Sequence, residues 1–146
     1  MDEMSQENDL TVFVYGSLQP GGRNWARYCE GKVVTQQPAQ VRGKLYRLRD
    51  PYPAVVLDAS KWVQGWRLVL RDADALRWFD ELENFDAARP PGQNEYQRVR
   101  TECFAGAENG AAPTTSLGEA WIYIMTPERI AAEGGLEIAD GKWTEP

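Results

Sequence analysis

Residues 11–22 read TVFVYGSLQPGG, an apolar segment that runs into a short loop rich in glycine. Residues 12–15 carry apolar or aromatic side chains on both alternating faces, which is typical of a strand buried on both sides. Residues 19–22 (QPGG) predict a turn. Between strand and turn, Gly16 permits close backbone approach, and the amides after it are candidates to bind an anion or a carbonyl oxygen. Taken alone, the stretch is more typical of an ordinary turn after a strand.

The composition is that of one soluble globular domain and excludes some classes of partner. The chain has 146 residues, of which 42% are hydrophobic and 26% charged. Its 22 acidic and 16 basic residues give a net charge of −6, which argues against binding to nucleic acid or to an anionic membrane surface. Residues 1–10 are polar and acidic, unlike a secretory signal, and we expect a flexible tail there, a folded domain over residues 11–146, and a cytoplasmic protein.

The absence of histidine restricts the chemistry of any active site. Catalysis by Ser-His-Asp or Cys-His groups within this chain is excluded, as is histidine-ligated zinc. The two cysteines, Cys29 and Cys103, form no zinc motif or disulfide framework. Proton transfer must therefore fall to Glu, Asp, Lys, Tyr or Cys, and Ser17 is a candidate for hydrogen bonding rather than attack.

The pattern of elements predicts an α+β fold in a single domain. Strands are expected at residues 11–15, 32–36, 41–48, 54–58, 62–70, 96–104 and 117–125, and helices at residues 25–30, near 75–85 and after residue 126. We also expect Asn24 to cap the first helix. Short turns between strands favour a mixed or antiparallel sheet that closes into a small β-barrel, flanked by two or three short helices. Residues 86–95 (DAARPPGQNE) predict a loop.

One carboxylate lies on the wrong face of the second helix. On a helical wheel, Glu83 falls about 20° from Leu76, inside the apolar stripe that also contains Phe79. A buried carboxyl has a raised pKa, which moves it toward the range useful for acid–base catalysis. Two other interpretations stay open: the helix frays there and Glu83 turns into solvent, or Glu83 pairs with Arg98.

Several segments, taken together and in order, match the motifs of one known family. The matching segments are VFVYGSLQPGGRN (12–24), DPYPAVV (50–56), VQGW (63–66), FDELENF (79–85), YQR (96–98), AWIY (120–123) and GKW (141–143). This set resembles the gamma-glutamylcyclotransferase-like family, also described as avirulence-induced-gene-like cyclotransferases. The resemblance implies a small β-barrel with flanking helices and covers the chain from about residue 11 to residue 143.

The resemblance also implies a site and a reaction. Residues Tyr15, Gly16, Ser17 and Leu18 line a cavity and hold the substrate through backbone amides, and Glu83 is the catalytic acid and base. The expected reaction converts a γ-glutamyl amide into 5-oxoproline and a free amine, with no metal and no cofactor. The partner is then a small molecule, and the protein is a monomer or a homodimer. Two alternatives are a non-catalytic module that binds a small carboxylate, and the same mechanism on a different γ-glutamyl amide.

Three further side chains are candidates for substrate binding. Tyr96 and Tyr123 are possible hydrogen-bond donors in the cavity, although core packing with a locally satisfied hydroxyl is the more common role. Arg98 is expected either to bind the substrate carboxylate or to pair with Asp80 or Glu83.

The sequence departs from the family pattern at three places near the site. Asn84 stands where the family has glycine, and both residues tolerate a left-handed backbone. The loop between Glu83 and Tyr96 is longer than usual, so we expect it to cover the cavity and alter the substrate. Gln19 stands where a basic residue is frequent.

Overall fold

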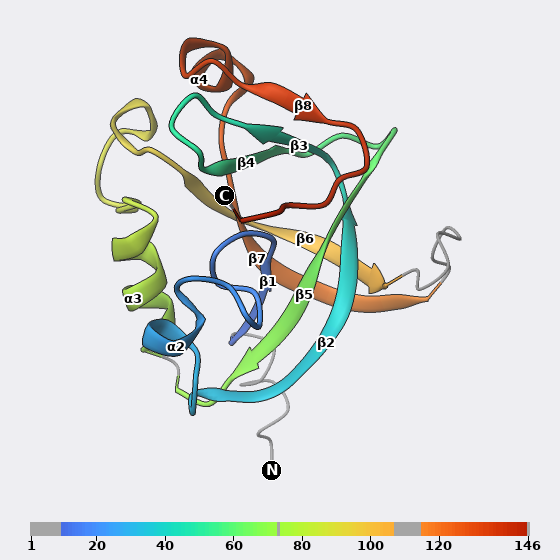
Figure 1. Ribbon diagram of the computed structural model, residues 1–146. Helices are drawn as coiled ribbons and strands as arrows, with labels where there is room; N and C mark the ends of the chain where they lie inside the picture. The colour runs from blue at the N-terminus through green and yellow to red at the C-terminus, as the bar shows by residue number, and fades with distance from the viewer. Residues whose placement is uncertain (1–9, 73, 107–114, 146) are drawn as a thin grey trace.

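A computed structural model describes residues 10–72, 74–106 and 115–145, and it contains a closed five-stranded barrel beside a three-stranded sheet (Figure 1). Three short α-helices accompany them: α2 (Trp25–Tyr28), α3 (Ala75–Leu82) and α4 (Pro127–Ala132). The predicted α+β barrel in one domain is therefore confirmed. The predicted tail lies outside the described residues except for Leu10, which is buried.

The barrel is built around the strand predicted from residues 11–15. Its strands are β1 (Thr11–Val14), β5 (Trp62–Leu70), β2 (Val33–Arg42), β6 (Gln97–Ala105) and β7 (Ser116–Ile124), in that order around the barrel. Neighbours along this order run antiparallel, and the barrel closes where β1 pairs with β7 in parallel, through Val12 and Trp121. The sheet is therefore mixed, as predicted.

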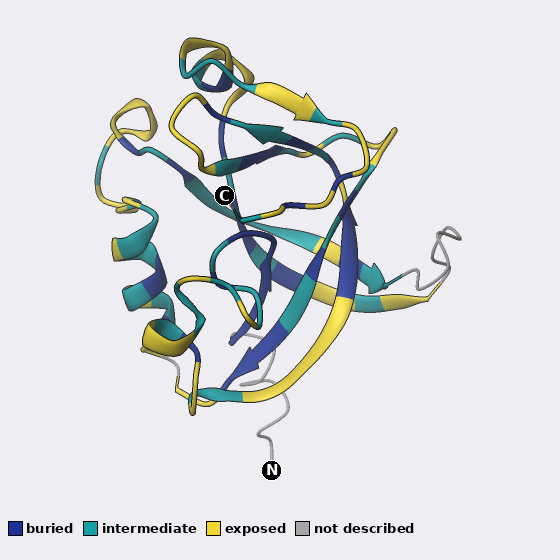
Figure 2. Cartoon of the chain, in the orientation of Figure 1, coloured by how far each residue is buried: buried dark blue, intermediate teal, exposed yellow. Residues whose placement is uncertain are grey.

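The two faces of β1 supply two different parts of the core. Val12 and Val14 belong to one cluster of buried side chains, and Phe13 and Tyr15 belong to a second. All four residues of β1 are buried, and Figure 2 shows this strand in dark blue. The prediction of a strand buried on both sides is confirmed, and this packing fixes where the following loop begins.

The break between the second and third strands was predicted in the wrong place. Instead of ending at residue 36, β2 continues through Pro38, which pairs with Trp66 of β5. Proline has no amide hydrogen, but it is tolerated because β6 pairs with β2 only at Ala39 and Gln40. The chain turns instead at Gly43, between β2 and β3 (Lys44–Arg47).

A second, three-stranded sheet packs at one end of the barrel. It contains β4 (Pro53–Val56), β3 and β8 (Leu136–Ile138), with β3 in the centre. The sequence did not predict β8. This strand has only three residues, and buried and exposed residues do not alternate along it. This sheet brings β4 against the loop that follows β1.

One of the helix termini, the start of α2, differs from the prediction. Thr126 caps α4 by accepting a hydrogen bond from the Arg129 amide at 3.2 Å. Asn24 precedes α2, but its side chain makes no capping bond and donates instead to Ser17 Oγ at 2.8 Å. The expected cap is wrong because the side-chain amide of Asn24 binds the loop after β1 instead.

Among the described residues, no helix is long and apolar enough to cross a membrane.

Candidate active site

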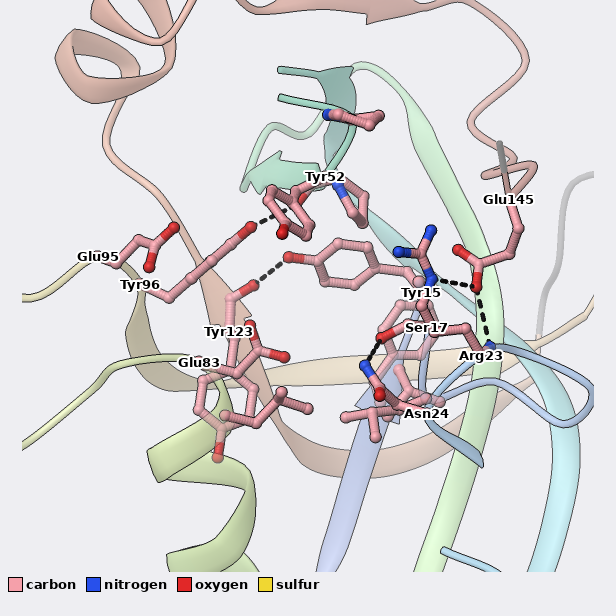
Figure 3. Close-up of a pocket in the computed structure, with 17 residues that line it drawn as sticks. Tyr15, Ser17, Arg23, Asn24, Tyr52, Glu83, Glu95, Tyr96, Tyr123 and Glu145 are labelled. Carbon is pink, nitrogen blue, oxygen red and sulfur yellow. Dashed lines mark hydrogen bonds and ion pairs between the residues drawn. The ribbon is translucent and has the colours of Figure 1, made fainter. Parts of the chain in front are cut away.

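The loop after β1 opens onto a cavity of about 400 Å³ between the barrel, β4 and the end of α3 (Figure 3). The residues that line it are Phe13, Val14, Tyr15, Gly16, Ser17, Leu18, Arg23, Asn24, Pro51, Tyr52, Pro53, Leu82, Glu83, Glu95, Tyr96, Tyr123 and Glu145. Seven of the eight predicted site residues are among them, and Arg98 is not. The structure therefore brings the loop and the misplaced carboxylate, 66 positions apart in the sequence, to one cavity.

Polar side chains hold the loop in a fixed shape. The side-chain amide of Asn24 donates to Ser17 Oγ, and its backbone amide donates to the Ser17 carbonyl at 2.9 Å. The side-chain amide of Gln19 donates to the carbonyls of Tyr15 at 3.0 Å and Gly16 at 3.2 Å. In contrast, the backbone amides of Gly16, Ser17 and Leu18 donate to no acceptor within the described part of the protein. These three consecutive donors beside a cavity suit an anion or a developing oxyanion.

Close packing explains the glycine at the start of this loop. A Cβ atom on Gly16 would lie 2.6 Å from Cγ of Pro53 in β4. Real Cβ atoms do not approach so closely, so a larger residue would push the loop and β4 apart. Gly16 thereby lets the loop form one wall of the cavity directly against the second sheet.

Three of the four tyrosines that line the cavity donate their hydroxyl groups to acceptors of the protein. Tyr15 donates to the Tyr123 carbonyl at 2.6 Å, Tyr96 to the Pro53 carbonyl at 2.7 Å, and Tyr123 to Asp80 Oδ1 at 2.6 Å. Burial is the main cause that raises the pKa of all three phenols, so they stay neutral. They shape the cavity and remain able to accept a hydrogen bond.

Arg98 lies behind this wall and pairs with Asp80. Its Nε donates to Asp80 Oδ1 at 2.8 Å and its terminal nitrogen to Oδ2 at 3.2 Å, while its guanidinium lies 4.5 Å from the Trp121 ring centroid. Arg98 was expected either to bind the substrate carboxylate or to pair with Asp80 or Glu83, and in the structure it pairs with Asp80. Through Asp80, Arg98 supports the hydroxyl of Tyr123.

Glu83 is the C-cap residue directly after α3, and a regular helix end fixes its position. The Asn84 amide donates to the Glu81 carbonyl at 3.2 Å, and the Phe85 amide donates to the Asp80 carbonyl at 2.9 Å. This is the Schellman arrangement, and it requires a left-handed residue, which is Asn84 with φ of 55°. The expectation that asparagine replaces glycine in this turn is confirmed. The helix thus ends in an ordered turn, which leaves Glu83 at the cavity.

The surroundings of Glu83 favour its protonated form. Burial, and then the negative charge of Glu95, raise its pKa from 4.5 to about 8. Glu83 is partly buried, and within the described residues its carboxyl group makes no hydrogen bond or ion pair. A carboxyl group with a pKa near neutrality can both accept and return a proton at the cavity surface.

Five polar or charged residues of the cavity were not predicted as site residues: Arg23, Asn24, Tyr52, Glu95 and Glu145. Glu145 accepts from the Arg23 amide at 2.9 Å and from Trp143 Nε1 at 2.8 Å, and its carboxylate lies 3.6 Å from Arg23 Nε. The contacts between Arg23 and Glu145 join residues 122 positions apart, which no local pattern reveals. Glu95 belongs to the long loop after α3. One indication of its role was present in the sequence, because this loop was expected to cover the cavity and alter the substrate.

In the described ranges, no group of three or more Cys, Asp or Glu residues is arranged to hold a metal ion.

A protein-family model described as "Gamma-glutamyl cyclotransferase, AIG2-like" matches residues 12–145. The chain belongs to this family. The family resemblance drawn from the sequence motifs is therefore confirmed. A comparison with curated proteins gave no match.

Solved structures share the fold of this cyclotransferase-like chain at low identity. An AIG2-like protein from Mus musculus is 18% identical, with a TM-score of 0.65, over 92% of this chain and 88% of that one. YkqA from Bacillus subtilis is 18% identical with a TM-score of 0.61; 91% of this chain aligns, but it spans only 39% of that protein. A structure described as a gamma-glutamyl cyclotransferase is 11% identical, with a TM-score of 0.52, over 88% of this chain and 69% of that one.

Proposed function

We propose that the protein cyclises the γ-glutamyl group of a small amide to 5-oxoproline and releases the amine. The observation that carries this proposal is the pairing, in one cavity, of a carboxyl group with a pKa of about 8 and three backbone amides that have no acceptor among the described residues. Membership of the gamma-glutamyl cyclotransferase, AIG2-like family supports the reaction class.

The reaction needs two proton transfers, and Glu83 is proposed for both. As the nitrogen of the uncharged substrate α-amino group attacks the γ-carbonyl carbon, ionised Glu83 takes one proton from that nitrogen. A new carbon–nitrogen bond closes a five-membered ring, and the carbonyl π electrons move onto oxygen. When the oxyanion collapses, the bond to the leaving nitrogen breaks and protonated Glu83 donates its proton to that nitrogen. Glu83 ends ionised, and the products are 5-oxoproline and an amine.

The loop after β1 is proposed to bind the negative charge of the substrate. The amides of Gly16, Ser17 and Leu18 would hold the α-carboxylate or the oxyanion that develops on the γ-carbonyl oxygen. Their geometry is preorganised because Asn24 and Gln19 already satisfy the other polar groups of the loop. A rigid donor set lowers the barrier because little reorganisation is needed at the moment of reaction.

The residues assigned to the reaction all belong to one chain, so this proposal requires no second subunit. It is compatible with the expected monomer or homodimer and the expected cytoplasmic location. The second candidate, a binding module without turnover, is disfavoured by Glu83. A pure carboxylate binder gains nothing from a desolvated carboxyl group in its cavity, because that group repels the ligand when ionised.

The test is a panel of γ-glutamyl amino acids and γ-glutamylamines assayed for 5-oxoproline. The matched substrate control is the α-glutamyl amide of each amine, whose carbonyl cannot form the five-membered ring with the same amino group. We expect product from at least one γ-linked amide and none from the α-linked controls. If no γ-linked amide yields 5-oxoproline, the proposed reaction is wrong and the binding module becomes the better description.

A further inference from the structure

The long loop after α3 is anchored so that one carboxylate points to the cavity. Asn94 is 3% exposed; its side chain accepts from the Asp86 amide at 3.0 Å and donates to the Asp86 carbonyl at 3.2 Å. Its own carbonyl accepts from Arg129 at 3.2 Å, and the next amide, of Glu95, donates to the Asn84 carbonyl at 3.2 Å. Of residues 86–95, only Glu95 lines the cavity. The loop therefore changes the cavity through a single acidic side chain.

The charges of the cavity leave this side chain without a counter-ion. The charged residues that line it are Arg23, Glu83, Glu95 and Glu145. Arg23 is engaged with Glu145. Glu83 is mostly protonated at neutral pH, since its pKa is about 8. Within the described residues, the Glu95 carboxylate makes no hydrogen bond or ion pair.

Glu95 lies on the same side of the cavity as the proposed proton carrier. Figure 3 shows Glu95 beside Tyr96 and on the side of Glu83, away from Arg23 and Glu145. Its negative charge acts on Glu83, so the two carboxyl groups are close enough to interact. Because Glu83 must reach the leaving nitrogen, a group a few bonds beyond that nitrogen comes within reach of Glu95. Tyr52, 53% exposed and also lining the cavity, offers an aromatic face to the same kind of group.

We propose that Glu95 is a specificity-determining residue that selects γ-glutamyl amides whose released amine carries a second positive charge, such as the monoamide of a short diamine. This inference rests on the proposed function, because it names the class of substrate for that site. A cation placed against an unpaired, partly buried carboxylate forms a charge-assisted hydrogen bond. An anionic leaving group meets repulsion at the same position, so the discrimination has both an attractive and a repulsive part.

The experiment compares three γ-glutamyl amides of similar length. Their amines are 1,4-diaminobutane (cationic end), pentylamine (neutral end) and 4-aminobutanoate (anionic end). We expect kcat/KM to fall in that order, with the cationic amide preferred over the neutral one by about tenfold or more. Glu95→Gln should reduce this preference toward one, and Glu95→Lys should favour the anionic amide. Glu81→Gln, which removes an exposed carboxylate of α3 outside the cavity, should leave the preference unchanged.

Equal kcat/KM for the cationic and neutral amides would overturn the inference. So would a Glu95→Gln variant that slows all three amides equally, because Glu95 would then act on the glutamyl part or only through Glu83. Binding of the same amides, measured by calorimetry, separates this inference from the proposed function. If none is turned over, the proposed function fails, and the binding order decides: tighter binding of the cationic amide that is lost in Glu95→Gln supports the inference, and equal binding contradicts it.

Discussion

Replacing Glu83 with glutamine should make the protein more stable at high pH and leave it nearly unchanged at low pH. The folded protein holds a proton on Glu83 up to a pKa of about 8, whereas the unfolded chain releases it near the ordinary value of 4.5. Between these values the folded state binds more protons than the unfolded state, so this group's contribution to stability falls as pH rises. Glutamine keeps the shape of the side chain and cannot ionise.

The size of the effect follows from the gap between the two pKa values. The full difference from 4.5 to about 8 corresponds to at most roughly 5 kcal/mol. That figure is an upper limit, because Glu83 is only partly buried and its ionised form keeps some hydration. Between pH 6 and pH 8 we expect the free energy of unfolding of Glu83→Gln to rise relative to the wild type by about 1–3 kcal/mol.

Urea unfolding followed by the fluorescence of the six tryptophans measures this difference at pH 6, 7, 8 and 9. Glu81→Gln is the matched control, since Glu81 is exposed on the same helix. Its free energy of unfolding should track the wild type at every pH. A constant difference between Glu83→Gln and the wild type would refute the reasoning, because the carboxyl group would then have an ordinary pKa in the folded protein.

Three further predictions concern the same site. With one γ-glutamyl amide, kcat/KM should rise with pH up to about 8 as Glu83 ionises, and Glu95→Gln should move this rise to lower pH because it removes a charge that raises the Glu83 pKa; an unmoved rise would contradict the coupling. Asn84→Ala should cost about 1–2 kcal/mol of unfolding free energy, since φ is 55°, whereas Asn84→Gly should retain stability in urea unfolding. Gly16→Ala should lower the free energy of unfolding by about 1–3 kcal/mol and abolish 5-oxoproline formation, because its Cβ would collide with Pro53. A variant as stable as the wild type in urea unfolding would contradict this, because the loop and Pro53 would then move apart without cost.

Local periodicity predicted the parts of the fold that local packing determines. The alternating apolar faces of residues 12–15 predicted β1 as a strand buried on both sides, and both faces do join the core. The 3.6-residue period of α3 placed Glu83 beside apolar residues, and the structure has it at a cavity. The asparagine after it predicted the left-handed helix end, because few other residues adopt that backbone.

Contacts between distant segments could not be read from local patterns. Pro38 indicated a break in the second strand, yet β5 on one side provides enough pairing to continue β2 through it. Asn24 had the right residue type for a helix cap, but Ser17 competes for its side chain. The Arg23–Glu145 contact and the short β8 depend on the folded barrel and have no periodicity of their own. Sequence reasoning left two roles open for Arg98, and the nearby Asp80 carboxylate is its partner in the fold.

The most direct test of Glu83 as the proton carrier is the rate of 5-oxoproline formation in matched variants. Wild type, Glu83→Gln and Glu81→Gln are compared at pH 8 with the best γ-glutamyl amide of the panel, after urea unfolding has shown that all three are folded. The account predicts that Glu83→Gln loses activity by about 100-fold or more, as removal of a general acid–base group does, while Glu81→Gln retains it. Undiminished 5-oxoproline formation by folded Glu83→Gln would contradict the central claim.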